Sequence, residues 1–151
     1  ATGDAHHLTA PHPEGAGAAR AMTLALQEAS IRPEQIGHIN AHGTSTGLGD
    51  IAEAMAVRRV FGEYGTRIPV NATKSLVGHL LGGSGALGAA CVAKTIATGE
   101  MHPSINVFTQ DPQCTFNIIH KPMKQEIEYG LANAFGFGGH NTCLVFGKYK
   151  D

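Results

Sequence analysis

Helical and strand-like segments alternate along this 151-residue chain, and this alternation restricts the fold more than any other feature. Met22, Leu26 and Ala29 recur at helical spacing, which predicts a helix over residues 16–29 that ends at the turn-forming stretch IRPEQ. The short apolar run IGHINA, residues 36–41, then predicts a buried strand. Such alternation is typical of an α/β domain.

The segments that follow continue the pattern. Asp50 and Glu53 have the spacing of a capping box, which predicts a helix that ends near Phe61. The stretch RIPVNAT predicts a second strand, and a helix of small residues is expected over residues 83–98, ended by Gly99. The final stretch LANAFGFGGHNTCLVFG has two β-prone segments joined across glycines, which predicts a hairpin.

Composition narrows the function classes. No polar linker divides the segments and 42% of the residues are hydrophobic, so residues 1–151 are expected to form one domain with its own core. A formal charge of -1 favours neither nucleic acid nor an anionic membrane, and no apolar run is long enough to span a bilayer. The first residues lack a signal-peptide pattern and are interpreted as a cut or processed end. The unpaired spacing of the cysteines favours a reducing compartment and a packing role for Cys91, Cys114 and Cys143.

The stretch NAHGTSTGLGD places His42 directly after the first buried strand. Ligands bind at the carboxyl ends of strands in open α/β sheets, so His42 is a candidate catalytic residue. Gly43 permits close backbone approach, and the hydroxyls of Thr44 and Thr46 are expected to face the same space. A structural histidine and ordinary loop-capping threonines are the alternatives.

A second polar cluster, NATKSLVGHLLGGSGALG, repeats this order of strand, polar residues, histidine and helix. A lysine here is often a solvated surface charge. If Lys74 instead lies near His42 or His79, its charge opposes protonation of the imidazoles. Neutral rings with N–H donors would then be available to stabilise a developing oxyanion.

Two rival site types are weaker. The stretch GSGALG, residues 83–88, fits the dinucleotide-binding pattern G-x-G-x-x-G, but the segment KSLVGHLLG separates it from the preceding strand. A zinc site is not favoured, because no C-x-x-C motif occurs and no histidine pair falls convincingly on one helix.

Three ordered motifs, NAHGTST, TKSLVGHLLG and FGFGGHN, resemble the C-terminal half of a β-ketoacyl-(acyl-carrier-protein) synthase of the elongating I/II type, in the thiolase superfamily. The similarity runs essentially end to end and includes DAHHLTAPHPEGAGAARAM and HPSIN. It implies a thiolase-like fold whose C-terminal half has a mixed five-stranded sheet with helices on both faces. A histidine at residue 79 is what separates elongating synthases from chalcone-synthase and initiating types, in which asparagine is expected.

The resemblance also implies an activity and its surroundings. Members attack an acyl thioester with a cysteine, decarboxylate malonyl-carrier protein and join the resulting carbanion to the acyl group. No cofactor or metal is implied, because the substrates are carried on the phosphopantetheine of acyl carrier protein. The implied partners are an N-terminal half, acyl carrier protein and, in the complete enzyme, a second copy. The compartments are plastid stroma, mitochondrial matrix or bacterial cytoplasm, and GGHN and TGEMHPSIN look most like plastid members.

Roles carry over to matching residues. His42 and His79 would hold the malonyl thioester oxygen during decarboxylation, with Lys74 beside them. Thr44 and Thr46 would hydrogen-bond the phosphopantetheine arm. The remaining matches lie in one loop, where Phe137 would form the gate between acyl and malonyl sites and its neighbours Phe135, Gly136 and Gly138 would shape the loop.

Two departures from the family pattern keep alternatives open. The nucleophilic cysteine belongs to the N-terminal half, so this chain alone is expected not to form an acyl-enzyme. Gly88 stands where the family often has a glutamate, and Lys74 would then be free or have another partner. A non-catalytic structural or carrier-protein-binding subunit is therefore the alternative function. A self-contained cysteine hydrolase is poorly supported, because no nucleophile elbow such as G-x-S-x-G is present.

Overall fold

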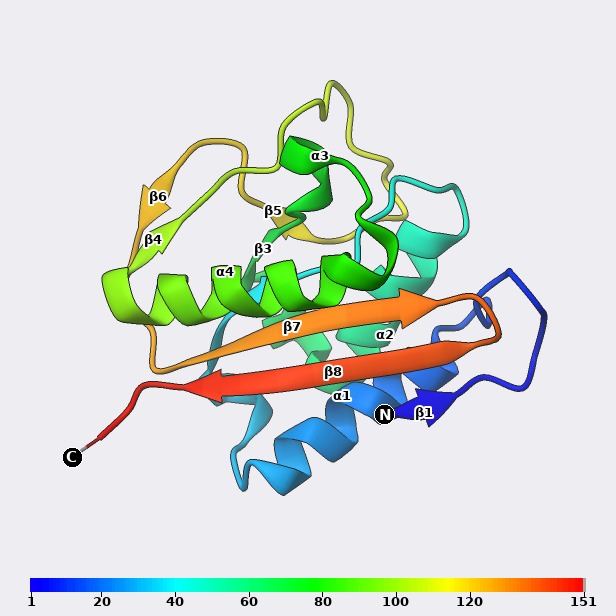
Figure 1. The fold of residues 1–151 in the computed structure, drawn as a ribbon, viewed down its shortest axis with the longest axis horizontal. Coiled ribbons are helices and arrows are strands. Elements are labelled where there is room, and N and C mark those ends of the chain that lie inside the picture. Colours follow the sequence, from blue (N-terminus) through cyan, green and yellow to red (C-terminus); the bar gives the residue numbers. More distant parts are fainter. Residues whose placement is uncertain (151) are drawn as a thin grey trace.

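A mixed six-stranded sheet with the order β1-β8-β7-β2-β3-β5 forms the centre of the fold (Figure 1). The computed structural model describes residues 1–150. β2 runs parallel to β3 and β7, β3 runs parallel to β5, and β8 is antiparallel to β7 and β1. The strands are β1 (Thr2–Gly3), β2 (Ile36–Asn40), β3 (Pro69–Asn71), β5 (Asn117–Ile118), β7 (Tyr129–Gly136) and β8 (His140–Gly147). A separate antiparallel pair consists of β4 (Glu100–Met101) and β6 (Met123–Lys124).

The α/β class and the mixed sheet are confirmed, but the sheet has six strands instead of the expected five. Both β1 and β5 are only two residues long. Such short strands contain no alternation that a sequence pattern can register, because at least four residues are needed to show a period of two. Their place in the sheet is decided by pairing with β8 and β3.

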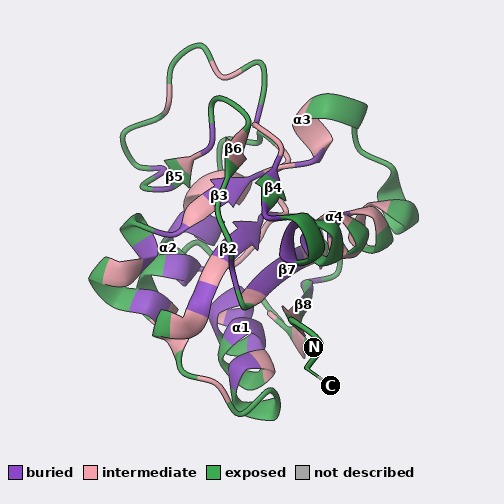
Figure 2. Ribbon diagram, turned by 90° about the vertical axis from the view of Figure 1, so that its left-hand side faces the viewer, coloured by how far each residue is buried: buried purple, intermediate pink, exposed green. Residues whose placement is uncertain are grey.

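Helices cover both faces of the sheet. α1 (Ala16–Glu28) and α2 (Gly49–Phe61) pack on one face, and α4 (Ser84–Thr98) packs on the other (Figure 1). Figure 2 shows buried residues concentrated in the central strands and on the sides of α1 and α2 that face them. The short elements are α3 (Lys74–Val77) and the 3₁₀ turns η1 (Pro33–Gln35), η2 (Gly62–Thr66) and η3 (Leu81–Gly83). No helix within residues 1–150 has the length and apolar character needed to cross a bilayer.

The two predicted helix ends had different outcomes. Gly99 ends α4 in the left-handed conformation, with φ 73°, and its N–H donates to the carbonyl of Thr95, as the sequence predicted. The capping box was wrong, because the N-cap of α2 is Leu48, whose side chain makes no cap hydrogen bond. Glu53 lies in the second turn and points into the core, so it cannot reach the first backbone N–H groups.

The parallel strands bring three loops to one edge of the sheet. β2, β3 and β7 all end there, so the segments after Asn40, after Asn71 and after Gly136 lie next to one another. These segments contain the three motifs that the sequence singled out. The sheet therefore assembles one site from stretches that are far apart in the chain.

Candidate active site

The two histidines lie side by side at this edge. His42 follows β2, and His79 follows α3 beyond Gly78, whose φ of 76° lets the chain turn back. The ring centroids are 5.8 Å apart and the planes meet at 82°. The ring of Phe135 lies 5.4 Å from that of His42 and forms an apolar wall. The structure thus brings together residues that are 37 positions apart, the difference between 79 and 42.

Hydrogen bonds to the backbone fix the orientation of both imidazoles. The N–H of Phe135 donates to Nδ1 of His42 at 3.2 Å, and the N–H of Leu81 donates to Nδ1 of His79 at 2.9 Å. A ring nitrogen that accepts a hydrogen bond carries no proton, so a neutral ring in this position has its proton on Nε2. Each histidine therefore offers one N–H donor from Nε2. A pair of N–H donors of this kind can stabilise an oxyanion.

The surroundings of His42 favour its neutral form. Burial lowers the pKa of His42 from 6.5 to about 4, and the charges of Lys74 and His79 act in the same direction. His42 is consequently uncharged at neutral pH. Its Nε2–H is therefore available as a hydrogen-bond donor.

Lys74 is held against the backbone beside His42. Its Nζ donates to the carbonyl oxygen of His42 at 2.6 Å, while burial lowers the pKa of the ammonium and the charges of Glu53 and Asp50 oppose that shift. In this chain the hydrogen-bond partner of Lys74 is the His42 carbonyl. A Cβ at residue 88 would lie 2.7 Å from Oδ1 of Asn40, so a side chain there would require the Asn40 side chain to move.

Glu53 is the site residue that the sequence analysis missed. Its Oε1 accepts the N–H of His42 and an Nδ2 hydrogen of Asn133, both at 2.9 Å, and its Oε2 accepts the N–H of Gly43 at 3.0 Å. Burial raises the pKa of this carboxyl, and the three hydrogen bonds oppose the rise. The signal was present, because Glu53 precedes Val57 by four residues and so lies on the apolar face of α2.

The predicted substrate-binding residues occupy two loops. The hydroxyls of Thr44 and Thr46 are 3.2 Å apart, and Thr46 also accepts the N–H of Gly49, so part of the alternative capping interpretation holds. Phe137 lies at the β7–β8 turn with 76% of its surface exposed. Gly136 ends β7 in an exposed position, and Gly138 has φ 81° and donates its N–H to the carbonyl of Leu8 at 2.6 Å.

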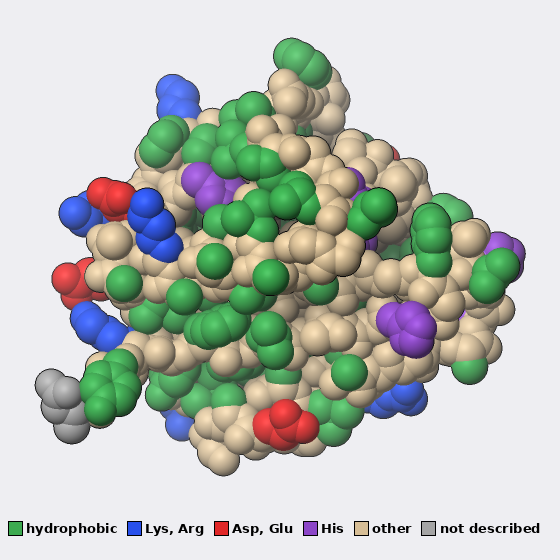
Figure 3. All heavy atoms as spheres, viewed as in Figure 1, with side chains coloured by type: hydrophobic (Ala, Val, Ile, Leu, Met, Phe, Trp, Pro, Cys, Tyr) green, Lys and Arg blue, Asp and Glu red, His purple; other side chains and the backbone are tan. Residues whose placement is uncertain are grey.

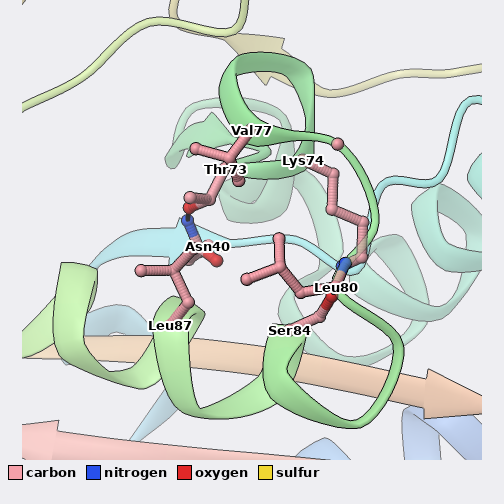
Figure 4. A pocket seen from close by; sticks show the side chains of 8 residues that line it. Asn40, Thr73, Lys74, Val77, Leu80, Ser84 and Leu87 are labelled. Atoms are coloured by element: carbon pink, nitrogen blue, oxygen red, sulfur yellow. Dashed lines mark hydrogen bonds between the residues drawn. The ribbon is translucent and has the colours of Figure 1, made fainter.

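Two hollows border Lys74. A small one is surrounded by side chains from β2, α3 and α4, with Asn40, Leu80 and Leu87 around it (Figure 4). A wider groove of about 280 Å³ lies between Thr44, Asp50 and the segment that contains Asn106. Lys74 therefore lies between buried polar groups and open space.

Two of the three cysteines have the packing role that their sequence context predicted. Cys114 and Cys143 belong to the main hydrophobic core, and burial raises the pKa of their thiols to about 11 and about 12. Both remain protonated near neutral pH and are poor nucleophiles. Cys91 is half-buried on α4.

Comparison with known proteins shows which family the chain belongs to. Residues 1–108 match the family described as "Beta-ketoacyl synthase, C-terminal domain". The chain is 44% identical over 150 residues to 3-oxoacyl-(acyl-carrier-protein) synthase 2 of Staphylococcus aureus, covering 99% of this chain and 36% of the relative. It is 43% identical over 148 residues to the chloroplastic 3-oxoacyl-(acyl-carrier-protein) synthase I of Hordeum vulgare, covering 97% and 32%.

Solved structures agree on the fold. A β-ketoacyl synthase from Burkholderia phymatum superposes with a TM-score of 0.91 at 39% identity, over 98% of this chain and 36% of that one. A type II polyketide synthase complex of acyl-carrier protein and ketosynthase gives a TM-score of 0.95 at 33% identity, over 98% and 36%. The fold is thus that of the ketosynthases, which is thiolase-like. The chain belongs to the β-ketoacyl synthase family and corresponds to its C-terminal domain. It spans about a third of the length of the curated relatives it matches.

Proposed function

We propose that this chain is the decarboxylating portion of a fatty-acid-elongating β-ketoacyl-(acyl-carrier-protein) synthase. The observation that carries the proposal is the pair of neighbouring imidazoles, His42 and His79, each with its Nε2–H left free by a backbone hydrogen bond to Nδ1. When a malonyl thioester loses carbon dioxide, the C–C bond to the carboxylate breaks and its electron pair forms an enolate. The two Nε2–H donors stabilise the negative charge on the thioester oxygen.

The condensation then needs a second reactant from outside this chain. The enolate carbon attacks the carbonyl of an acyl thioester, the new C–C bond forms, and a cysteine thiolate leaves. We assign that cysteine to an N-terminal half, because Cys114 and Cys143 are buried with raised pKa values and Cys91 lies along α4. The acyl carrier protein delivers the malonyl group on phosphopantetheine, with Thr44 and Thr46 contacting the arm.

The exposed face of α4 is where the N-terminal half is proposed to dock. Ala86, Ala90, Ala93 and Ala97 form an exposed stripe of small apolar side chains along this helix. Figure 3 shows hydrophobic side chains gathered on the same side of the molecule, and Leu81 nearby is 78% exposed. A flat helix face of this kind permits close packing against a second layer. The complete enzyme is proposed to dimerise and to work in a bacterial cytoplasm or a plastid, since one relative above comes from a bacterium and the other is named as chloroplastic.

Phe137 is proposed as the gate from the family resemblance, and its exposed position supports the assignment. The side chain is exposed on a turn whose glycines, Gly138 and Gly139, have φ angles of 81° and 76°. Such a turn can change conformation with little steric cost. Phe135, by contrast, is held against His42 by the hydrogen bond from its backbone N–H.

A non-catalytic subunit is the second candidate function. Gly88 in place of an acid favours it, and two similar solved structures are complexes of a ketosynthase with a chain length factor. The test is to combine this chain with a matching N-terminal half and to measure carbon dioxide released from malonyl-carrier protein. Release above that of either half alone supports the enzyme. A complex that binds carrier protein and releases no carbon dioxide supports the non-catalytic subunit.

A further inference from the structure

Four polar residues form a closed hydrogen-bonded circuit behind the histidine pair. Nδ2 of Asn40 lies 2.8 Å from Oδ1 of Asn71 and 2.7 Å from Oγ1 of Thr73. Nδ2 of Asn71 lies 2.9 Å from the carbonyl oxygen of His102, and Oγ1 of Thr73 lies 3.0 Å from Nε2 of His102. Nδ1 of His102 lies 2.9 Å from the carbonyl oxygen of Pro103. Asn40, Asn71 and Thr73 are buried.

The direction of every hydrogen bond in this circuit follows from the two carbonyl oxygens, which can only accept. The carbonyl of His102 requires Nδ2 of Asn71 to donate, so Oδ1 of Asn71 accepts from Asn40. Asn40 uses its other amide hydrogen on Thr73, which leaves the Thr73 hydroxyl to donate to Nε2 of His102. Nε2 is then unprotonated, and Nδ1–H donates to the carbonyl of Pro103. His102 therefore has the opposite tautomer to His42 and His79.

We propose that His102 is a positioning residue for the reacting histidines, an inference that rests on the proposed function. The circuit holds the ends of β2 and β3 together at the points from which the site loops leave. Asn40 is two residues before His42, and Thr73 directly precedes Lys74, at the start of the helix that leads to His79. The unprotonated Nε2 of His102 accepts the only hydrogen that Thr73 has to donate. Loss of that acceptor leaves the hydroxyl hydrogen of Thr73 without an acceptor and loosens the base of α3.

The circuit makes a prediction that does not depend on activity. In protein that contains this chain, labelled with ¹⁵N and studied by NMR, the His102 ring is expected to show the Nδ1–H tautomer. The rings of His42 and His79 are expected to show the Nε2–H tautomer. An Nε2–H tautomer at His102 would overturn the proposal, whatever the catalytic result.

Paired variants then test the positioning role. Gln places an acceptor oxygen near the position of Nε2, whereas Leu fills the space without one, so His102→Gln is the matched control for His102→Leu. In the reconstituted enzyme, His102→Leu is expected to lower kcat for malonyl decarboxylation about tenfold with little change in KM. A loss of this size corresponds to the free energy of about one hydrogen bond. His102→Gln is expected to stay within about twofold of the parent.

The two failures are distinguishable. If the parent enzyme releases no carbon dioxide, the proposed function fails, and the positioning role is decided by whether His102→Leu moves the imidazole ¹⁵N shifts of His79 and His42. If the parent is active and His102→Leu matches it in kcat with unchanged ¹⁵N shifts, the positioning role is wrong and the proposed function stands.

Discussion

The two faces of the sheet are built differently. The face under α1 and α2 holds the larger hydrophobic cluster, which includes Met22, Ile39, Val57 and Leu131. The face under α4 holds a smaller cluster around Val92, and the polar residues His38, Asn40 and Asn71 are buried in the same half of the molecule. The first face therefore supplies most of the stability. The second supplies the polar groups that position the site.

Glu53 is a polar residue from the face under α1 and α2 that also helps to position the site. It comes from α2, yet its carboxyl reaches the edge of the sheet and holds the backbone of His42 and Gly43. A buried carboxylate with three donors is stable only while all of them remain, because an unpaired buried charge is costly. The apolar face thus fixes the turn that carries the first histidine.

The largest expected effect is on folding. Met22→Ala removes a fully buried side chain from the larger cluster and is expected to lower the free energy of unfolding by about 2–5 kcal/mol. Leu24→Ala in the same helix is the control, because Leu24 is 37% exposed and should cost much less. Urea denaturation followed by circular dichroism measures both. Equal losses would show that burial of Met22 in the larger cluster does not carry the expected stabilisation.

The next largest expected effect is on malonyl decarboxylation and concerns the two histidines at the edge of the sheet. His42→Ala and His79→Ala should each lower malonyl decarboxylation in the reconstituted enzyme about 10²–10³-fold, because each removes one oxyanion donor. Acyl transfer to the partner's cysteine should be spared. His120→Ala, at an exposed histidine outside the site, should leave both steps unchanged. Equal loss of both steps in the site variants would contradict the assigned roles.

The smallest effect is a pH dependence of stability. Burial lowers the pKa of His38 and of His42 from 6.5 to about 4. Between these values the unfolded chain binds more protons, so the two histidines make stability fall as pH drops from about 6.5 toward 4. The pKa values of Glu53 and Asp50 are raised by burial, and their contribution to the pH dependence of stability has the opposite sign.

The matched variant isolates the contribution of one histidine. His38→Gln should flatten the decrease in urea midpoint between pH 7 and pH 5, whatever its effect on absolute stability. His120→Ala should leave the slope of the parent unchanged. A His38→Gln variant with the same pH slope as the parent would contradict this account of the buried rings.

The sequence predicted the helices and the long hairpin because their patterns are local. The helix now seen at Ala16–Glu28 was expected over residues 16–29, and Gly99 ended α4 as its position implied. The capping box failed for a physical reason. Asp50 and Glu53 have the spacing of a capping box, but Glu53 is buried in the folded chain. The spacing of two polar residues in the sequence does not show whether one of them caps the helix or lies in the core.

The amino-acid sequence by itself determined the α/β class and named the residues that meet at the edge of the sheet, because helical and strand periodicity and short motifs are written in neighbouring positions. Only the tertiary structure decided which nitrogen of each imidazole carries the proton, which group Lys74 contacts, and that Asn40 closes a circuit with Thr73. These features depend on hydrogen bonds across large sequence separations, such as the 93 positions between His42 and Phe135. Such bonds form only after the strands have paired and brought their ends together.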